Sequence, residues 1–210
     1  MRTPWTILAA GLVLLAALLN PAVAVAEDDG FRPLFNGKDF SGWIEPEDKD
    51  LFSVENGEIV GRTTSKDQLK KNEFLVTEEK FGDFVLKSQI KLINGNSGIQ
   101  IRSNRAEDGA VAGPQADVAD GYWGLLYEER ERGILDRYPA EKVAELVKED
   151  DWNEYLITFK GDHLVIELNG TKVIDRKDPE FRAEGIIGLQ LHVGPPMEVR
   201  FKDIMIKSLD

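Results

Sequence analysis

The chain has 210 residues, no cysteine and a formal net charge of −12, because 38 acidic residues outnumber 26 basic ones. An excess of negative charge repels phosphate backbones and anionic lipid surfaces, so we expect no nucleic-acid partner. The lack of cysteine excludes a disulfide framework and cysteine-based metal sites. The sequence also lacks a phosphate-binding glycine loop, an HExxH motif and a GxSxG motif, which argues against nucleotide enzymes, zinc peptidases and common serine hydrolases.

Residues 1–26 have the three-part pattern of a secretory signal: Arg2, an apolar stretch over residues 7–19, and small residues that end at Ala26. The apolar stretch is shorter than the roughly 20 residues that a membrane-spanning helix needs. We therefore expect cleavage after Ala26 and a secreted or periplasmic protein with no integral membrane segment and no lipid-bearing cysteine. The signal holds one Arg and no acid, so its removal changes the net charge from −12 to −13. Residues 27–210 are predicted to form a single domain.

Alternating apolar and polar residues recur along residues 27–210 and are separated by glycine-containing turns, which predicts an all-β fold. Two Asn-Gly pairs favour the positive φ angles of tight hairpin turns, so hairpins are predicted over residues 52–62 and 163–176. Further strands are predicted over residues 84–92, 97–103, 152–159 and 185–192. Together these elements indicate an antiparallel two-sheet β-sandwich.

Two places depart from simple alternation. After Pro139, the residues Ala140, Val143, Ala144 and Val147 share one helical face, which predicts one short helix. In the last strand, Val199 and Phe201 are out of phase with Ile204 and Ile206, and a β-bulge near Lys202 and Asp203 would realign them.

The candidate site comes from three strands that each carry a Gln and a second polar residue on one face. These pairs are Gln100 with Arg102, Gln115 with Asp117, and Gln190 with His192. A solvated sheet face also carries polar residues, but it more often uses Thr, Lys, Glu and Ser. Planar amide, guanidinium, carboxylate and imidazole groups are suited to directional hydrogen bonds with sugar hydroxyls. The pattern therefore favours a saccharide as the partner.

Aromatic and charged residues are concentrated between residues 119 and 138, which we take as a candidate site loop together with residues 104–113. An aromatic ring can stack on the apolar face of a pyranose, so we expect Trp123 or Tyr127 to face the ligand. Glu128 and Arg130 belong to a charge run beside these aromatics. Such a run is usually a solvated surface, but its position adds both residues to the candidates.

Of the two histidines, His192 is the better functional candidate, because it shares a strand face with Gln190 and can act as acid, base or neutral metal ligand. His163 lies at the start of a predicted hairpin, where an exposed structural role is expected.

Five sequence blocks resemble the 3-keto-disaccharide hydrolase domain family in order along the chain. They are Leu34-Phe35-Asn36-Gly37-Lys38-Asp39 leading to Gly42-Trp43, Asn96-Ser97-Gly98-Ile99 leading to Arg102, Trp152-Asn153-Glu154-Tyr155, Gly188-Leu189-Gln190-Leu191-His192, and Phe201-Lys202-Asp203-Ile204. The resemblance implies a concanavalin A-like jelly roll whose concave sheet holds a saccharide. It also implies cleavage of glycosides in which C3 of the sugar is oxidised to a ketone.

A C3 ketone makes the C2 proton acidic, so a base can form an enolate and the glycosidic oxygen can leave C1, with hydration completing a net hydrolysis. This chemistry needs a base, a group that stabilises the enolate oxygen, and an acid for the leaving group. Fitting residues to these roles, we expect His192 or Asp117 as base, Arg102 as enolate stabiliser, alone or with a divalent metal, and Glu128 as acid. Asp117, Glu128 and His192 are also considered as metal ligands, although no diagnostic spacing supports them.

Two alternatives remain open at this point. The first is a non-catalytic, lectin-like carbohydrate-binding module, because fold does not fix function. The second is an ordinary glycoside hydrolase that takes its two carboxylates from Asp117, Asp120, Glu128 and Glu129.

Overall fold

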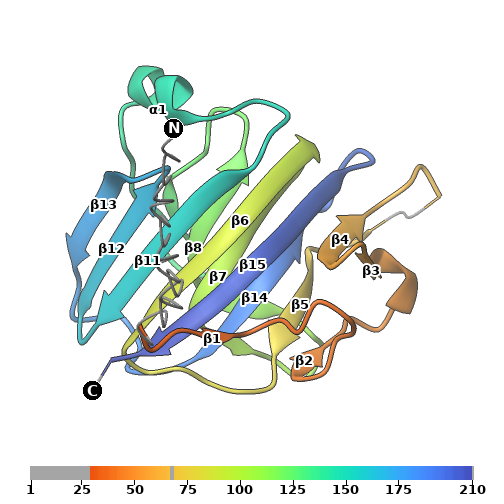
Figure 1. Cartoon of the computed structure of the whole chain (residues 1–210), viewed down its shortest axis with the longest axis horizontal. Coiled ribbons are helices and arrows are strands. Elements are labelled where there is room, and N and C mark those ends of the chain that lie inside the picture. Colours follow the sequence, from red (N-terminus) through yellow and green to blue (C-terminus); the bar gives the residue numbers. More distant parts are fainter. Residues whose placement is uncertain (1–28, 67–68, 210) are drawn as a thin grey trace, which may run out of the picture.

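The computed structural model describes residues 29–66 and 69–209, which form two antiparallel β-sheets packed face to face, with one short α-helix (Figure 1). The predicted signal segment lies outside the described residues and stays a prediction. Within the described ranges, no helix has both the length and the apolar character needed to cross a bilayer. The expected all-β sandwich is confirmed.

The first sheet lies in front in Figure 1 and has the strand order β13-β12-β11-β6-β15-β4-β3, with β1 pairing to β15. Its strands are β13 (Thr171–Lys177), β12 (His163–Leu168), β11 (Asn153–Lys160), β6 (Phe84–Asn94), β15 (Glu198–Ser208), β4 (Glu58–Arg62), β3 (Phe52–Glu55) and β1 (Arg32–Pro33). A short 3₁₀ helix, η1 (Lys49–Leu51), precedes β3.

The second sheet lies behind the first and has the order β10-β9-β8-β7-β14-β5-β2. Its strands are β10 (Gly133–Asp136), β9 (Leu126–Glu129), β8 (Val111–Ala119), β7 (Asn96–Arg105), β14 (Ile186–Leu191), β5 (Glu73–Thr77) and β2 (Trp43–Ile44). The core fills the space between the sheets. Ile99, Val118 and Leu189 face it from the second sheet, and Phe84 and Phe159 face it from the first, with their rings edge to face.

Both predicted hairpins are confirmed, and their turns have the expected geometry. Asn56 and Gly57 join β3 to β4 with φ angles of 53° and 82°, and Asn169 and Gly170 join β12 to β13 with 49° and 78°. Positive φ at both central residues matches the twist of the flanking strands, which explains why Asn-Gly occurs at each turn.

The helix and the bulge are also where the sequence places them. Helix α1 (Ala140–Leu146) follows Pro139 and buries Val143 against the core. The pairing of β15 with β6 shifts register between Lys202 and Met205, and Asp203 has a φ of 50°. The extra residue brings Ile204 and Ile206 onto the core face that Phe201 already occupies.

A second bulge, in β7, overturns the expected placement of Arg102. Between the pairs Gln100↔Gln115 and Asn104↔Ala112, β7 has one residue more than β8, and Arg102 has a φ of 45°. The bulge turns Arg102 away from the face of Gln100 and into the space between the sheets, where its side chain is fully buried. The prediction that Arg102 shares the polar face and stabilises an enolate there is therefore wrong.

The Arg102 guanidinium is held entirely by the first sheet and the loops beside it. It donates to the carbonyl oxygens of Gly82 (2.8 Å), Gly161 (2.6 Å) and Arg182 (3.1 Å), and to Asp83 Oδ1 (2.6 Å). It also lies 3.8 Å from the ring centroid of Phe159. A planar donor with five N–H groups suits such a cluster of acceptors, so Arg102 fastens the two sheets together.

Replacing Arg102 by Met should lower the free energy of unfolding by about 3 kcal/mol or more, because several buried acceptors lose their donor. Urea-induced unfolding measures this loss. Arg105→Met is the matched control, since Arg105 is exposed near the end of the same strand, and it should change stability by no more than about 0.5 kcal/mol. Equal stability of the two variants would contradict the structural role of Arg102.

Candidate functional site

The outer face of the second sheet, opposite the core, carries polar side chains in two cross-strand rows. One row runs through Gly188, Gln100, Gln115 and Tyr127, which pair in register across β14, β7, β8 and β9. In the next row Asp117 pairs with Gly98 across β8 and β7. Directly opposed residues of antiparallel strands share a face, so the register alone brings the amides and the carboxylate together.

A cavity of about 300 Å³ opens on this face and gathers half of the predicted site residues. The predicted residues that line it are Gln115, Asp117, Tyr127, Gln190 and His192. The predicted pairs of β8 and β14 therefore meet as expected from their alternation, and Tyr127 of β9 lies beside them.

Glycine 98 makes room for the centre of this site. A Cβ atom at Gly98 would lie 2.5 Å from Cδ of Gln115, a separation that real structures do not tolerate. The missing side chain lets the Gln115 amide lie flat across β7, between Gln100 and Asp117. This close approach explains why a glycine stands in the middle of a strand.

A chain of short polar contacts runs beneath the cavity. The Ser103 hydroxyl and the Gln100 amide are 2.6 Å apart, the amides of Gln100 and Gln115 are 2.7 Å apart, and Gln115 Nε2 donates to Asp117 Oδ1 (2.6 Å). Gln100 is fully buried and supports Gln115 from below. Gln100 was predicted to bind substrate, but it does not line the cavity and instead contacts Gln115, which does.

Asp117 is the group in this cavity whose acid–base behaviour is most changed by its surroundings. Burial raises its pKa to about 7, and the charge of Glu129 adds to the rise, while the hydrogen bond from Gln115 opposes it. A carboxyl with a pKa near neutrality can both take up and release a proton at physiological pH. Asp117 therefore has the properties of a general base or acid.

His192 lies at the mouth of the same cavity and is partly exposed. Its Nδ1 is 2.6 Å from the carbonyl oxygen of Val193. Because a carbonyl only accepts, Nδ1 carries the hydrogen, and Nε2 of the neutral ring has a free lone pair. His192 can therefore exchange a proton with a ligand through Nε2.

Glu128 is not part of this cavity, so its expected role as the acid is wrong. Within β9, Tyr127 and Glu129 face the cavity, whereas Glu128 points to the opposite side and is almost fully buried. Both of its oxygens accept from Arg132, which also contacts Asp178 at 2.9 Å. Adjacent residues on a strand point to opposite faces, so Tyr127 and Glu128 could not both line one cavity.

The metal set considered from the sequence does not form, because Glu128 lies apart from Asp117 and His192. Among the residues that the structure describes, no three His, Asp or Glu side chains are grouped so that they could hold a metal ion. Of the other acids, Glu129 lines the cavity with Asp117, whereas Asp120 lines a different one. Arg130 is exposed in the β9–β10 turn and does not line the cavity.

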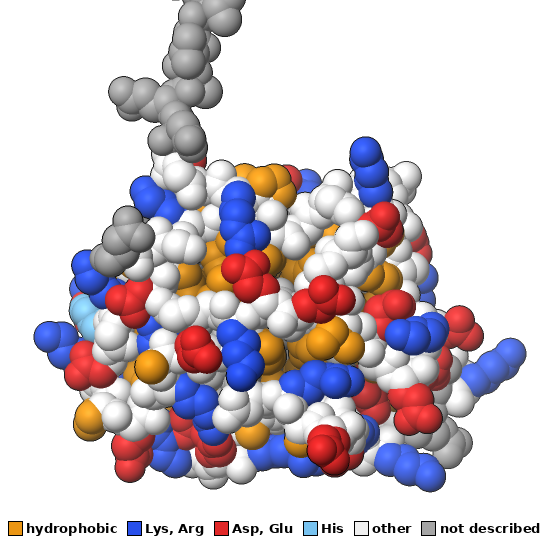
Figure 2. All heavy atoms as spheres, turned by 90° about the horizontal axis from the view of Figure 1, so that it is seen from below, with side chains coloured by type: hydrophobic (Ala, Val, Ile, Leu, Met, Phe, Trp, Pro, Cys, Tyr) orange, Lys and Arg blue, Asp and Glu red, His pale blue; other side chains and the backbone are white. Residues whose placement is uncertain are grey.

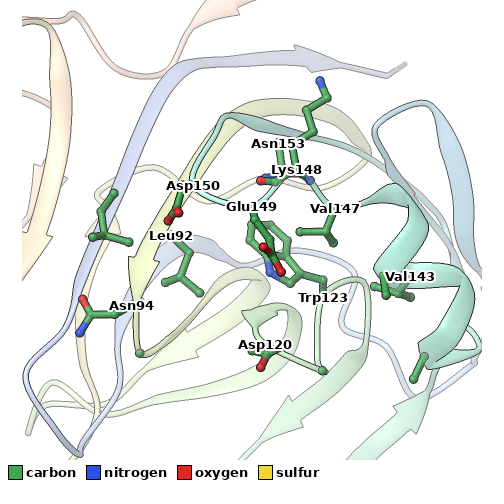
Figure 3. A pocket seen from close by; sticks show the side chains of 15 residues that line it. Leu92, Asn94, Asp120, Trp123, Val143, Val147, Lys148, Glu149, Asp150 and Asn153 are labelled. Carbon is green, nitrogen blue, oxygen red and sulfur yellow. The ribbon is translucent and has the colours of Figure 1, made fainter.

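Trp123 lines a second cavity, of about 320 Å³, at the end of the sandwich beside α1 (Figure 3). Figure 3 places its ring at the centre, with Val143 and Val147 on the helix side and Leu92 on the other. Trp123 is only 7% exposed, and its ring centroid is 6.0 Å from that of Tyr155. Of the two aromatic residues expected to face a ligand, Tyr127 lines the Asp117 cavity and Trp123 does not.

Three polar or aromatic residues of the Asp117 cavity were not among the predicted site residues: Asn72, Asn96 and Tyr122. A fourth, Glu129, was considered only as one of the carboxylates of an ordinary glycoside hydrolase. Asn96 has the same strand parity as Gly98 and Gln100, so alternation extended by one step would have found it. Asn72 donates to Glu129 (3.3 Å) and accepts from the Val193 amide (2.9 Å), but it precedes β5 in a stretch without a sequence signal.

One face of the molecule, seen from below, carries charged groups of both signs (Figure 2). Figure 2 shows the molecule from below, where acidic and basic side chains are interspersed and hydrophobic side chains are visible between them. A surface of mixed charge is typical of a solvated side. We therefore place the candidate site in the cavity around Asp117.

Comparison with solved structures shows the fold. A protein from Parabacteroides distasonis ATCC 8503 with a provisional glycosyl hydrolase assignment is 24% identical, covering 86% of this chain and 94% of its own, with a TM-score of 0.64. The carbohydrate-binding module CBM66 from Bacillus subtilis is 19% identical over 80% of this chain and 96% of its own, with a TM-score of 0.60. The β-glucanase of Bacillus licheniformis is 11% identical over 86% and 97%, with a TM-score of 0.56.

These similarities confirm the concanavalin A-like jelly roll expected from the sequence. No curated protein matches the chain. The model of one protein family, described as the 3-keto-alpha-glucoside-1,2-lyase-like domain, matches residues 30–207. The chain therefore belongs to the 3-keto-alpha-glucoside-1,2-lyase-like domain family.

Proposed function

We propose that this protein cleaves glycosides whose sugar carries a ketone at C3, and that the reaction takes place in the Asp117 cavity. One observation carries the proposal: a buried carboxyl whose pKa is raised to about 7 lies in a cavity lined by amides and by Tyr127. Membership of a family named for a lyase reaction on 3-keto-α-glucosides agrees with proton abstraction as the first step.

In the proposed reaction Asp117 is the base. Its carboxylate takes the proton from C2, and the electron pair of the broken C–H bond forms a C2=C3 double bond, which leaves a negative charge on the C3 oxygen. When that charge returns to form the ketone, a double bond forms between C1 and C2, and the glycosidic oxygen leaves C1 with the bonding electrons. Burial keeps water away from the carboxylate and supports this role.

The leaving oxygen needs a proton, and His192 is the group placed to give it. The protonated ring can donate through Nε2, while the hydrogen bond from Nδ1 to the Val193 carbonyl stabilises the positive charge. Addition of water to the C1=C2 bond would complete a net hydrolysis. His192 thus replaces Glu128, which lies outside the cavity, as the acid.

A non-catalytic saccharide-binding module is the second candidate function, since CBM66 shares the fold. The deciding experiment mixes purified protein with a 3-keto-disaccharide and with the unoxidised parent, each with and without a chelator. Release of product from the oxidised sugar alone is the expected result, and the chelator shows whether a divalent metal takes part. Binding of either sugar without any cleavage would favour the binding module and contradict the proposal.

Asp117→Asn should lower kcat for the 3-keto-disaccharide by about 100-fold or more, because an amide cannot take up the C2 proton. In the wild-type protein the active carboxylate is lost as the pH falls through about 7, so kcat/KM should fall below that pH. Asp120→Asn removes an exposed carboxylate outside the cavity and serves as the control. A pH profile that stays flat between pH 5 and pH 8 would exclude Asp117 as the base.

His192→Ala should abolish measurable turnover without unfolding the protein, because its Nε2 proton is needed at the leaving oxygen. Circular dichroism and product release measure the two effects. His163→Ala is the matched control, since His163 is paired with Asp175 on the other sheet. Full activity of His192→Ala would remove this residue from the mechanism.

A further inference from the structure

The proposed reaction places a negative charge on the C3 oxygen, and a cation would be the usual partner for it. Arg102 was expected in this role but lies between the sheets with its N–H groups bonded to protein oxygens. The described residues that line the Asp117 cavity include no Lys and no Arg. His192 also lines the cavity but is assigned to the leaving oxygen, so the C3 oxygen is left to a neutral hydrogen-bond donor.

Gln190 has such a donor. Its side chain is fully buried at the floor of the cavity, and its Nε2 has no hydrogen-bond partner among the described residues. An unpaired buried donor destabilises a fold by about 1–3 kcal/mol, and native structures contain few of them. A donor kept in this state, in the wall of a cavity, indicates a partner supplied by a ligand.

The surroundings of Gln190 favour one orientation of its side-chain amide. Strand β14 lies between β5 and β7, so the backbone of Gln190 is held on both sides, and its carbonyl oxygen also accepts from Ser97 Oγ at 2.7 Å. Its Oε1 faces Gln115 Nε2 at 3.4 Å. With the oxygen turned toward Gln115, the Nε2 group is the end of the amide left without a partner among the described residues.

We propose that Gln190 Nε2 donates a hydrogen bond to the C3 oxygen of the substrate and stabilises the enolate that forms when Asp117 takes the C2 proton. This inference rests on the proposed function. The C2–H bond breaks, its proton moves to Asp117, its electron pair forms the C2=C3 bond, and the charge that reaches the C3 oxygen is met by the Gln190 amide. The assignment makes Gln190 a catalytic residue.

The hydrogen bond favours the oxidised sugar for a physical reason. A ketone or enolate oxygen only accepts, so it matches a group that only donates. The hydrogen bond strengthens as negative charge develops on the oxygen, whereas a C3 hydroxyl gains no such charge during binding. Gln190 therefore contributes more to turnover of the keto-sugar than to binding of its parent.

Gln190→Met tests the assignment, because Met keeps the length of the side chain and removes the donor. We expect kcat for the 3-keto-disaccharide to fall about 100-fold, with the thermal unfolding midpoint unchanged or raised, since an unpaired donor has been removed. Gln89→Met is the matched control, because Gln89 lies on β6 of the other sheet and bonds to Glu154. The control should retain wild-type kcat.

Two results would overturn the assignment: an unchanged kcat, or a fall in kcat that is accompanied by a lower unfolding midpoint, as a structural role would give. Calorimetric binding separates this inference from the proposed function. If the wild-type protein binds the keto-sugar without cleaving it, the proposed reaction fails. Gln190→Met should then still weaken keto-sugar binding about tenfold, with the parent sugar little affected. A wild-type protein that binds neither sugar overturns both.

Discussion

A single guanidinium between two sheets sets the arrangement on which the rest of the molecule depends. Arg102 joins β7 of the second sheet to Gly82, Asp83 and Gly161 on the first, at a point where regular alternation would have sent it to the outer face. The bulge that turns Arg102 inward also brings Ser103 beside Gln100 on the outer face. One extra residue therefore has two effects: Arg102 bonds to the first sheet through the core, and Ser103 contacts the Gln100 amide beneath the cavity.

The outer face is unusual because its polar groups are buried rather than solvated. Gln100, Gln115, Asp117 and Gln190 are each less than 10% exposed, so their hydrogen bonds form in a region of low dielectric constant. The same burial that strengthens these hydrogen bonds makes the charge on Asp117 costly, which is why its pKa rises. The raised pKa of Asp117 and the strength of these hydrogen bonds thus have one physical origin, the burial of this face.

The sequence allowed prediction of the fold and of which residues meet at the centre of the candidate site, because both depend on period-two alternation and on Asn-Gly turns. Gln115, Asp117, Gln190 and His192 meet because their strands are regular at those positions. The predicted position of Arg102 was wrong because a one-residue bulge leaves no signal in the alternation when polar residues flank it. The prediction that Glu128 is the acid was wrong because its charge run indicates a loop, whereas β9 is a strand whose neighbouring residues face opposite sides. The place of Asn72 in the cavity could not be predicted, because it depends on which strands lie side by side.

Tyr155, on β11 of the first sheet, contacts the strand of the second sheet that carries Asp117. Its hydroxyl, fully buried, donates to the Asp117 carbonyl oxygen and accepts from the Gly124 amide, both at 2.6 Å. The segment that separates the two cavities is thereby fastened to β11 rather than free to vary by itself. At the tip of that segment Tyr122 is 46% exposed, so its side chain can be replaced without disturbing the core. The Tyr155 hydroxyl of the first sheet thus holds the backbone of Asp117 and Gly124 in place, while the side chain at the tip of the segment between them is left unconstrained.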